Sequence, residues 1–111
     1  MNAATTNIAP STEARTFLER KHQLLIDGQW VAAVSGETTE IFDPATEQHL
    51  ATVAAGGKAD IDRAVAAARK ALRGEWSNLT SYHRTRLTLK LADELEANIG
   101  LSGDIETLDN G

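Results

Sequence analysis

The stretch Gly56-Gly57-Lys58-Ala59-Asp60-Ile61-Asp62-Arg63-Ala64-Val65-Ala66-Ala67-Ala68-Arg69-Lys70-Ala71-Leu72-Arg73-Gly74 is where a strand pattern gives way to a helix pattern. Its apolar positions recur at i, i+3, i+4, i+7 and i+11, which predicts one helical stripe made of Ile61, Ala64, Val65, Ala68 and Leu72. Aspartates fall in the first turn and basic residues in the last, as the helix dipole favours, and Gly74 ends the helix. Since the stripe is rich in alanine, we expect this helix to lie close against a sheet or another helix.

Short extended segments precede this helix. Leu24-Leu25-Ile26 and Trp30-Val31 flank Asp27-Gly28, which suits a type I′ turn because both central residues of that turn need positive φ. Two further strands are expected at residues 38–42 and 50–54, with a turn at Asp43-Pro44 after the first of them. Together these segments predict a small antiparallel β element.

Residues 1–11 are small and polar, which predicts a disordered tail, and residues 12–111 form the structured part. Ser11 or Thr12 caps a short helix that we expect to run to about His22. On the other side of the central helix, residues 75–79 are expected to form a loop.

The C-terminal third is expected to be helical. Thr80 or Ser81 caps a long helix whose apolar residues are spaced every four positions, at Leu87, Leu91, Leu95 and Ile99. We expect Gly100 to end this helix, and a last short helix to cover residues 102–108.

Composition excludes several classes of protein. The net charge of −5 argues against nucleic acid and anionic membrane surfaces as partners. The absence of cysteine excludes a disulfide framework and a cysteine nucleophile within these residues. The apolar runs are too short to span a bilayer, and residues 1–10 fit no signal or transit peptide, so the expected location is the cytoplasm.

No catalytic constellation is visible in the residues themselves. Three histidines, His22, His49 and His83, lie on different predicted elements without a ligand partner at helical spacing, which favours surface or capping roles over a metal site. Gly56-Gly57 precedes a helix and could cradle a phosphate, but without a G-x-G-x-x-G context a plain strand-to-helix turn is favoured.

Trp30 and Trp76 could stack on a ligand. Flanked by short apolar segments, they are more often anchors of a small core, and we expect that role here.

Several motifs, in a fixed order over about residues 17–111, resemble the N-terminal segment of aldehyde dehydrogenases. They are Leu25-Ile26-Asp27-Gly28-Gln29-Trp30, Ser35-Gly36-Glu37-Thr38, Phe42-Asp43-Pro44-Ala45-Thr46, Ala51-Thr52-Val53, the stretch 60–69, Trp76, the stretch 84–93 and Glu106-Thr107-Leu108-Asp109-Asn110-Gly111. The lead-in Phe17-Leu18-Glu19-Arg20-Lys21-His22 is similar to bacterial phenylacetaldehyde dehydrogenases.

The resemblance implies an α/β fold: the N-terminal portion of a Rossmann-like coenzyme-binding domain, with a short β hairpin element and three to four helices, incomplete as a domain. It also implies an NAD(P)-dependent enzyme that oxidises an aldehyde, such as phenylacetaldehyde or another aromatic aldehyde, to the carboxylic acid and forms homo-oligomers. In the family, the regions after the Asp-Asn-Gly motif carry the catalytic cysteine, the catalytic glutamate and the coenzyme-binding turn. By itself this segment is therefore expected to carry no catalytic or coenzyme-binding residue, and whether it ends naturally at residue 111 stays open.

The family resemblance offers one site within these residues. Some members bind a structural Na⁺ or K⁺ through main-chain carbonyls before the Asp-Pro-Ala segment and through the aspartate of Glu-Thr-Leu-Asp; the matching positions are Ile41, Phe42 and Asp109. The alternative is an ordinary strand end and helix C-terminal turn. The sequence also departs from the family at residues 100–105, where the family usually shows a Glu-Glu-Leu-Ala-x-Leu pattern. Here Leu101 is one position early, Ser102 replaces an expected apolar residue, and two glycines enter.

Two functions from different classes remain. One is a non-catalytic piece of an aldehyde dehydrogenase. The other is a stand-alone module that binds a full-length relative. Exposed apolar faces on the alanine-rich helix would favour the first.

Overall fold

The computed structural model describes residues 9–111. In chain order the elements are α1 (Thr12–Leu18), β1 (Leu24–Ile26), β2 (Gln29–Val31), β3 (Thr38–Phe42), β4 (His49–Ala54), α2 (Lys58–Arg73), α3 (Glu75–Asn78), α4 (Ser81–Ala97) and α5 (Ile99–Asn110). The predicted tail over residues 1–11 lies, for residues 1–8, outside the described part.

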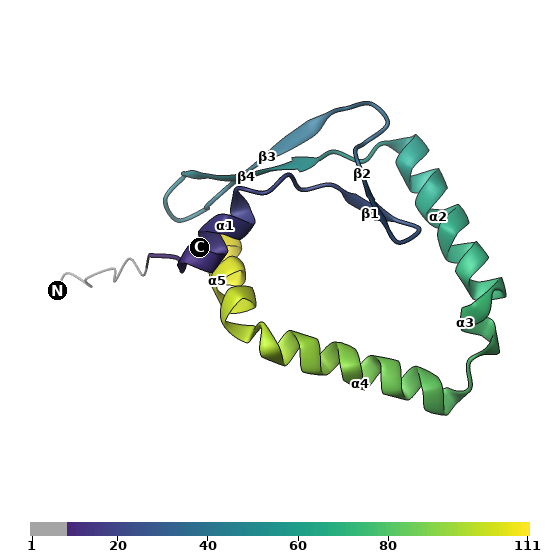
Figure 1. The fold of residues 1–111 in the computed structure, drawn as a ribbon. Helices are drawn as coiled ribbons and strands as arrows, with labels where there is room; N and C mark the ends of the chain where they lie inside the picture. Colours follow the sequence, from purple (N-terminus) through teal and green to yellow (C-terminus); the bar gives the residue numbers. More distant parts are fainter. Residues whose placement is uncertain (1–8) are drawn as a thin grey trace.

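The elements follow one another around an open ring (Figure 1). The two hairpins form one side, α2 and α3 a second, and α4 a third, and α5 returns to α1. The radius of gyration is 18.2 Å, whereas a compact chain of this length would have about 13 Å. The fold is therefore a frame and not a closed globule.

The β1–β2 hairpin confirms the turn predicted from Asp27-Gly28. Asp27 has φ 52° and Gly28 has φ 74°, so both central residues occupy the left-handed region that a type I′ turn requires. The strands pair antiparallel, with Leu25 opposite Trp30. A side chain at Gly28 would meet no atom within 4 Å, so its backbone conformation alone selects glycine.

The second hairpin, β3–β4, matches the two predicted strands closely. It is antiparallel, and its register shifts between Ile41 and Phe42, where two residues oppose His49-Leu50-Ala51. The expected single β element is in fact two separate two-stranded sheets. The chain turns at Ala33–Gly36 before β3 begins, and His22, which precedes the first sheet, makes an isolated bridge to Val53 of the second.

Helix α1 is shorter than predicted. Ser11 caps it, as expected, by accepting a 3.2 Å hydrogen bond from the Ala14 amide. The helix ends at Leu18 and not near His22, because the His22 carbonyl accepts a 2.9 Å hydrogen bond from the Ala54 amide. Because its carbonyl is bonded to the edge of β4, the backbone at His22 cannot continue the helix.

Two boundaries in the C-terminal half also differ from the prediction. The expected loop at residues 75–79 contains the single-turn helix α3. Helix α4 ends at Ala97, since the Asn98 side chain donates a 2.8 Å hydrogen bond to the Glu94 carbonyl and its backbone leaves the helical region. Gly100 therefore lies inside α5 and does not end α4, whereas the predicted cap at Thr80 is confirmed by its 3.3 Å bond from the His83 amide.

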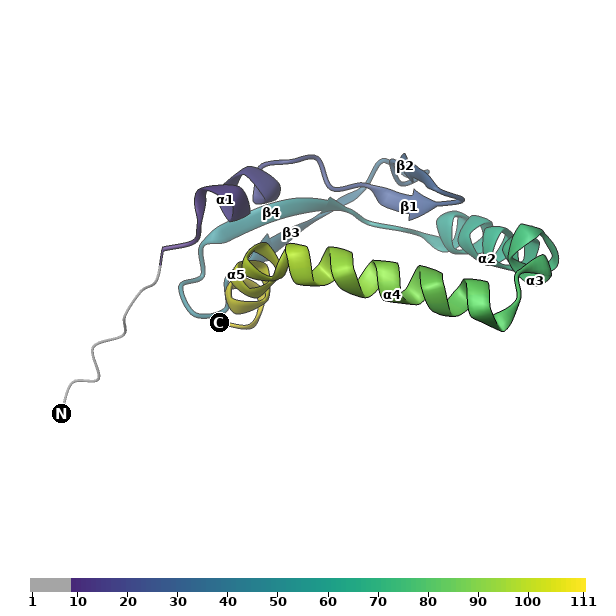
Figure 2. The ribbon, with the colours of Figure 1, turned by 60° about the horizontal axis from the view of Figure 1, so that its bottom comes forward.

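The ring closes between the two ends of the described chain. The Ser11 amide donates a 3.1 Å hydrogen bond to Asp104 Oδ2, which links the start of α1 to α5. α1 contacts α5, which it overlaps in Figure 1, and Figure 2 shows both helices at the same end of the frame. This carboxylate accepts from both the Ser11 hydroxyl and its amide, which holds the pKa of Asp104 below its usual value.

Within residues 9–111 the buried apolar residues are three alanines, Ala14, Ala33 and Ala51. Large apolar side chains are exposed instead, including Trp30 (67%) and Trp76 (44%), so the expectation that the tryptophans anchor a core is wrong. On α2 the large residues of the stripe, Ile61, Val65 and Leu72, are exposed as well. Its alanines lie beside the first hairpin, so the expected close packing holds for the alanines and not for the large residues. The local sequence pattern determines which face of a helix is apolar, but the surface that covers this face must come from residues outside the helix.

Candidate functional site

The largest cavity among those found in the described residues lies between the β3–β4 hairpin, α1 and α5. It measures about 760 Å³ and is mostly apolar. Ile41 and Asp109 line it together, from opposite sides, although they are far apart in sequence. Phe42 does not line it: its side chain is 54% exposed and lies edge-on to the His49 ring at 5.7 Å.

The turn after β3 holds the end of α5 in place. Asp43 accepts a 2.8 Å hydrogen bond from the Ala45 amide and another of 2.8 Å from the Thr46 hydroxyl. The bond from Thr46 is the larger cause that keeps the pKa of Asp43 below its usual value, and the Ala45 amide adds to it. Gly111, with φ 86°, lies so close to this turn that a Cβ there would be 3.1 Å from Pro44 Cγ.

The structure thus brings the carboxyl end of β3 near the carboxyl end of α5, where Ile41 and Asp109 line one cavity and Phe42 does not. A carboxylate with main-chain carbonyls offers oxygen ligands and a single negative charge, which suit a hard monovalent cation. The register shift at Ile41/Phe42 interrupts the regular ladder at the relevant carbonyls.

Gly56-Gly57 does not form a phosphate cradle. The Gly57 amide donates a 3.1 Å hydrogen bond to Asp60 Oδ2, and the carboxylate occupies the N-terminal end of α2. An anionic ligand would meet this buried carboxylate, which is 3% exposed. The predicted role as a strand-to-helix turn is the one that the geometry supports.

Asp60 also links α2 to the connection between β2 and β3. Both of its oxygens lie 3.2 Å from the Val34 amide, in the connection between β2 and β3, and Arg63 Nη1 lies 3.7 Å from Oδ1. From its place in the first helical turn, Asp60 is predicted only to interact with the helix dipole. The spacing Gly57-x-x-Asp60, which is that of a capping box, is the signal that could have revealed more.

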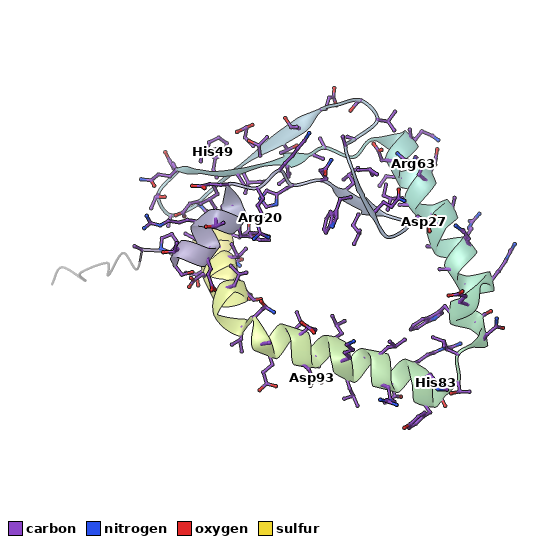
Figure 3. All side chains as sticks on the ribbon, in the orientation of Figure 1. Arg20, Asp27, His49, Arg63, His83 and Asp93 are labelled. Carbon is purple, nitrogen blue, oxygen red and sulfur yellow. The ribbon has the colours of Figure 1, made fainter. Side chains whose placement is uncertain are left out.

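The histidines lie on different parts of the fold, as predicted: His49 is in β4 and His83 in α4 (Figure 3), and His22 precedes β1. His49 Nε2 pairs with Glu40 Oε2 at 2.5 Å on the outer side of the second hairpin. His83 Nδ1 lies 2.8 Å from the capping hydroxyl of Thr80, and His22 Nε2 lies 3.3 Å from the Leu18 carbonyl. Over residues 9–111 no group of three or more His, Asp or Glu side chains could hold a metal ion.

The same residues include no helix with both the length and the apolar character needed to cross a bilayer.

Comparisons with known proteins agree with the resemblance. The model of the aldehyde dehydrogenase family matches residues 30–111. An aldehyde dehydrogenase of Alternaria alternata is 40% identical over 96% of this chain, and the betaine aldehyde dehydrogenase of Bacillus subtilis (strain 168) is 37% identical over 79% of it. These matches cover 21% and 18% of the two relatives, so the chain spans about a fifth of their length.

The fold agrees as well. The structure of an aldehyde dehydrogenase from Bacillus cereus in its NAD⁺ complex superposes with a TM-score of 0.90 at 40% identity, over 96% of this chain and 22% of that one. The matched region is the N-terminal part of the aldehyde dehydrogenase structures, as expected. With a matching family model over most of its residues and a matching fold, the chain belongs to the aldehyde dehydrogenase family.

Proposed function

We propose that this chain is the N-terminal scaffold of an NAD(P)-dependent aldehyde dehydrogenase and performs no chemistry by itself. The observation that carries the proposal is the 40% identity and 0.90 TM-score to an aldehyde dehydrogenase solved with NAD⁺, over nearly the whole chain. The described residues supply a frame: two hairpins and five helices held by hydrogen bonds at their joints, with apolar faces left exposed.

The exposed faces also favour this function over a stand-alone module. A module that folds by itself would bury its own large side chains, whereas Leu72 is 68% exposed and Ile99 is 70% exposed. Burial of apolar surface is the main stabilising contribution in folding, so these faces call for further polypeptide.

The activity proposed for the whole enzyme is oxidation of an aldehyde to its carboxylic acid, with the hydride transferred to NAD⁺ or NADP⁺. Phenylacetaldehyde is the substrate that we propose to test first, on the basis of the lead-in Phe17-Leu18-Glu19-Arg20-Lys21-His22. We further propose a homo-oligomer in the cytoplasm. These proposals follow from the family and from the sequence.

Ile41, Phe42 and Asp109 are proposed as part of a shell for Na⁺ or K⁺ in that enzyme. The support is that Ile41 and Asp109 line one cavity. If this is right, replacing K⁺ by a bulky organic cation should lower the thermal stability of the enzyme. The variant Asp109→Asn should abolish that dependence, while an unchanged dependence on K⁺ in the variant would refute the assignment.

The proposed function can be tested on native material. An antibody against residues 12–111 should detect a species about five times heavier than the 11.9 kDa of this chain, since the chain covers 21% of a full relative. The purified species should reduce NAD⁺ or NADP⁺ when phenylacetaldehyde is added. A native species of 11.9 kDa without this activity would contradict the proposal and favour the stand-alone module.

A further inference from the structure

Among the described residues, helix α4 contacts α5 and the Trp76 region of α3 only near its two ends, and nothing covers its length. Each of its residues except Arg84 is exposed. Leu87, Leu91 and Leu95, which follow one another at four-residue spacing, are 49%, 60% and 58% exposed. An isolated helix of this length is marginal in water, because helices in proteins owe most of their stability to packing of one face. The leucine row therefore requires a covering surface.

Helix α2 presents a second uncovered row. Ile61, Val65 and Leu72 are 59%, 45% and 68% exposed. The adjoining alanine side of the helix faces the first hairpin, where alanines at positions 64, 67, 68 and 71 line a hollow with residues 25–28. Lys70 Nζ is fixed there by a 3.0 Å ion pair with Asp27. The hairpin thus holds α2 in position without covering its apolar row.

The joints of the ring are made within the chain itself. Asp60 connects α2 to the β2–β3 connection, Arg84 holds α4 against α3 by donating a 3.1 Å hydrogen bond to the Trp76 carbonyl, and Asp104 connects α5 to α1. The Arg84 guanidinium also lies over the Trp76 ring, 5.5 Å from its centroid. The positions of the two apolar rows relative to each other are therefore set by contacts at the corners of the frame.

We propose that the apolar rows of α2 and α4 form a docking surface for the remaining part of an aldehyde dehydrogenase, and that this surface suffices for association without a covalent link. The proposal rests on the proposed function and adds the residues of the interface. The occupant follows from the comparison: this chain matches 22% of the Bacillus cereus enzyme, so the other 78% of that polypeptide is available to cover these faces.

The experiment uses this chain and the Bacillus cereus enzyme without its matching segment. The two are co-expressed, with an affinity tag on the enzyme body, and are also joined in one covalent chimaera. We expect the separate chain to co-purify with the tagged body in equimolar amount, and we expect both forms to reduce NAD⁺ with an aldehyde.

Two variants test the surface itself. Leu91→Asp places a charge in the proposed apolar interface and should weaken co-purification at least about tenfold. Leu89→Asp is the matched control: Leu89 is 59% exposed, close to the 60% of Leu91, but points about 200° away around the helix. Its effect should be less than about twofold. Equal losses in the two variants would overturn the assignment of the interface.

The outcomes separate the two proposals. An active chimaera, together with a separate chain that does not co-purify, would overturn docking without a covalent link and leave the function standing. A folded chimaera that binds NAD⁺ but oxidises no aldehyde would contradict the proposed function, and the docking proposal with it.

Discussion

Replacing Asp60 by alanine should loosen the joint between α2 and the β2–β3 connection more than any other single change in the first turn of α2. The Asp60 carboxylate is 3% exposed and accepts hydrogen bonds from the Val34 and Gly57 amides at 3.2 and 3.1 Å. After the substitution, both amides lose their partner while they remain within the fold. A hydrogen bond to a charged group contributes about 1.5–3 kcal/mol, and loss of a cap costs about 1 kcal/mol.

The two effects overlap, because the Gly57 bond is itself the cap. We therefore expect a local destabilisation of about 2–3 kcal/mol. Since 1.4 kcal/mol corresponds to a tenfold change in an equilibrium constant, the Val34 and Gly57 amides should exchange with solvent about 30 to 150 times faster. Amide hydrogen exchange followed by NMR measures this at each residue.

Asp62 provides the control in the same helical turn. Its side chain is 63% exposed and makes an i,i+4 ion pair with Lys58 at 2.6 Å. Such exposed pairs contribute about 0.2–0.5 kcal/mol, so Asp62→Ala should change exchange at Val34 by no more than about twofold. If the two alanine variants exchanged equally fast at Val34, the Asp60 carboxylate would not be what holds this joint.

Three further predictions follow from single positions. Gly28→Ala should destabilise the first hairpin by about 1–2 kcal/mol, because φ is 74° there; unchanged cross-strand NOEs between residues 25 and 30 would contradict this. Gly103→Ala should stabilise α5 by about 0.5–1 kcal/mol, since the position is helical and the added Cβ meets nothing within 4 Å; circular dichroism during thermal unfolding should show a higher midpoint. The Asp43 turn should open in acid: the folded pKa of Asp43 is held below its usual 3.8, so its contribution to stability is present above that value and is lost as pH falls through the folded pKa. Chemical shifts of the Ala45 and Thr46 amides report the transition, and Thr46→Val should move it to higher pH by removing the larger of the two hydrogen bonds.

The sequence determined the parts of the fold whose causes are local. Asp27-Gly28 specified its turn because only residues that tolerate positive φ can occupy both central positions. Gly74 and Thr80 marked helix boundaries through chain conformation and capping, which depend on a few neighbouring residues. The ordered motifs likewise pointed to the aldehyde dehydrogenase family, which the comparisons then confirmed.

Tertiary structure alone decided the features that depend on residues distant in sequence. α1 ended early because β4 takes the backbone of His22, and the two hairpins formed separate sheets because the chain turns away at Ala33–Gly36. Asp60 bonds to Val34, which lies 26 positions away, and Asp109 lies in one cavity with Ile41 where α5 returns to α1 and Asp104 bonds to Ser11. Periodicity identified the apolar rows of α2 and α4, but whether a row is buried depends on what lies opposite it, and within residues 9–111 nothing covers these rows.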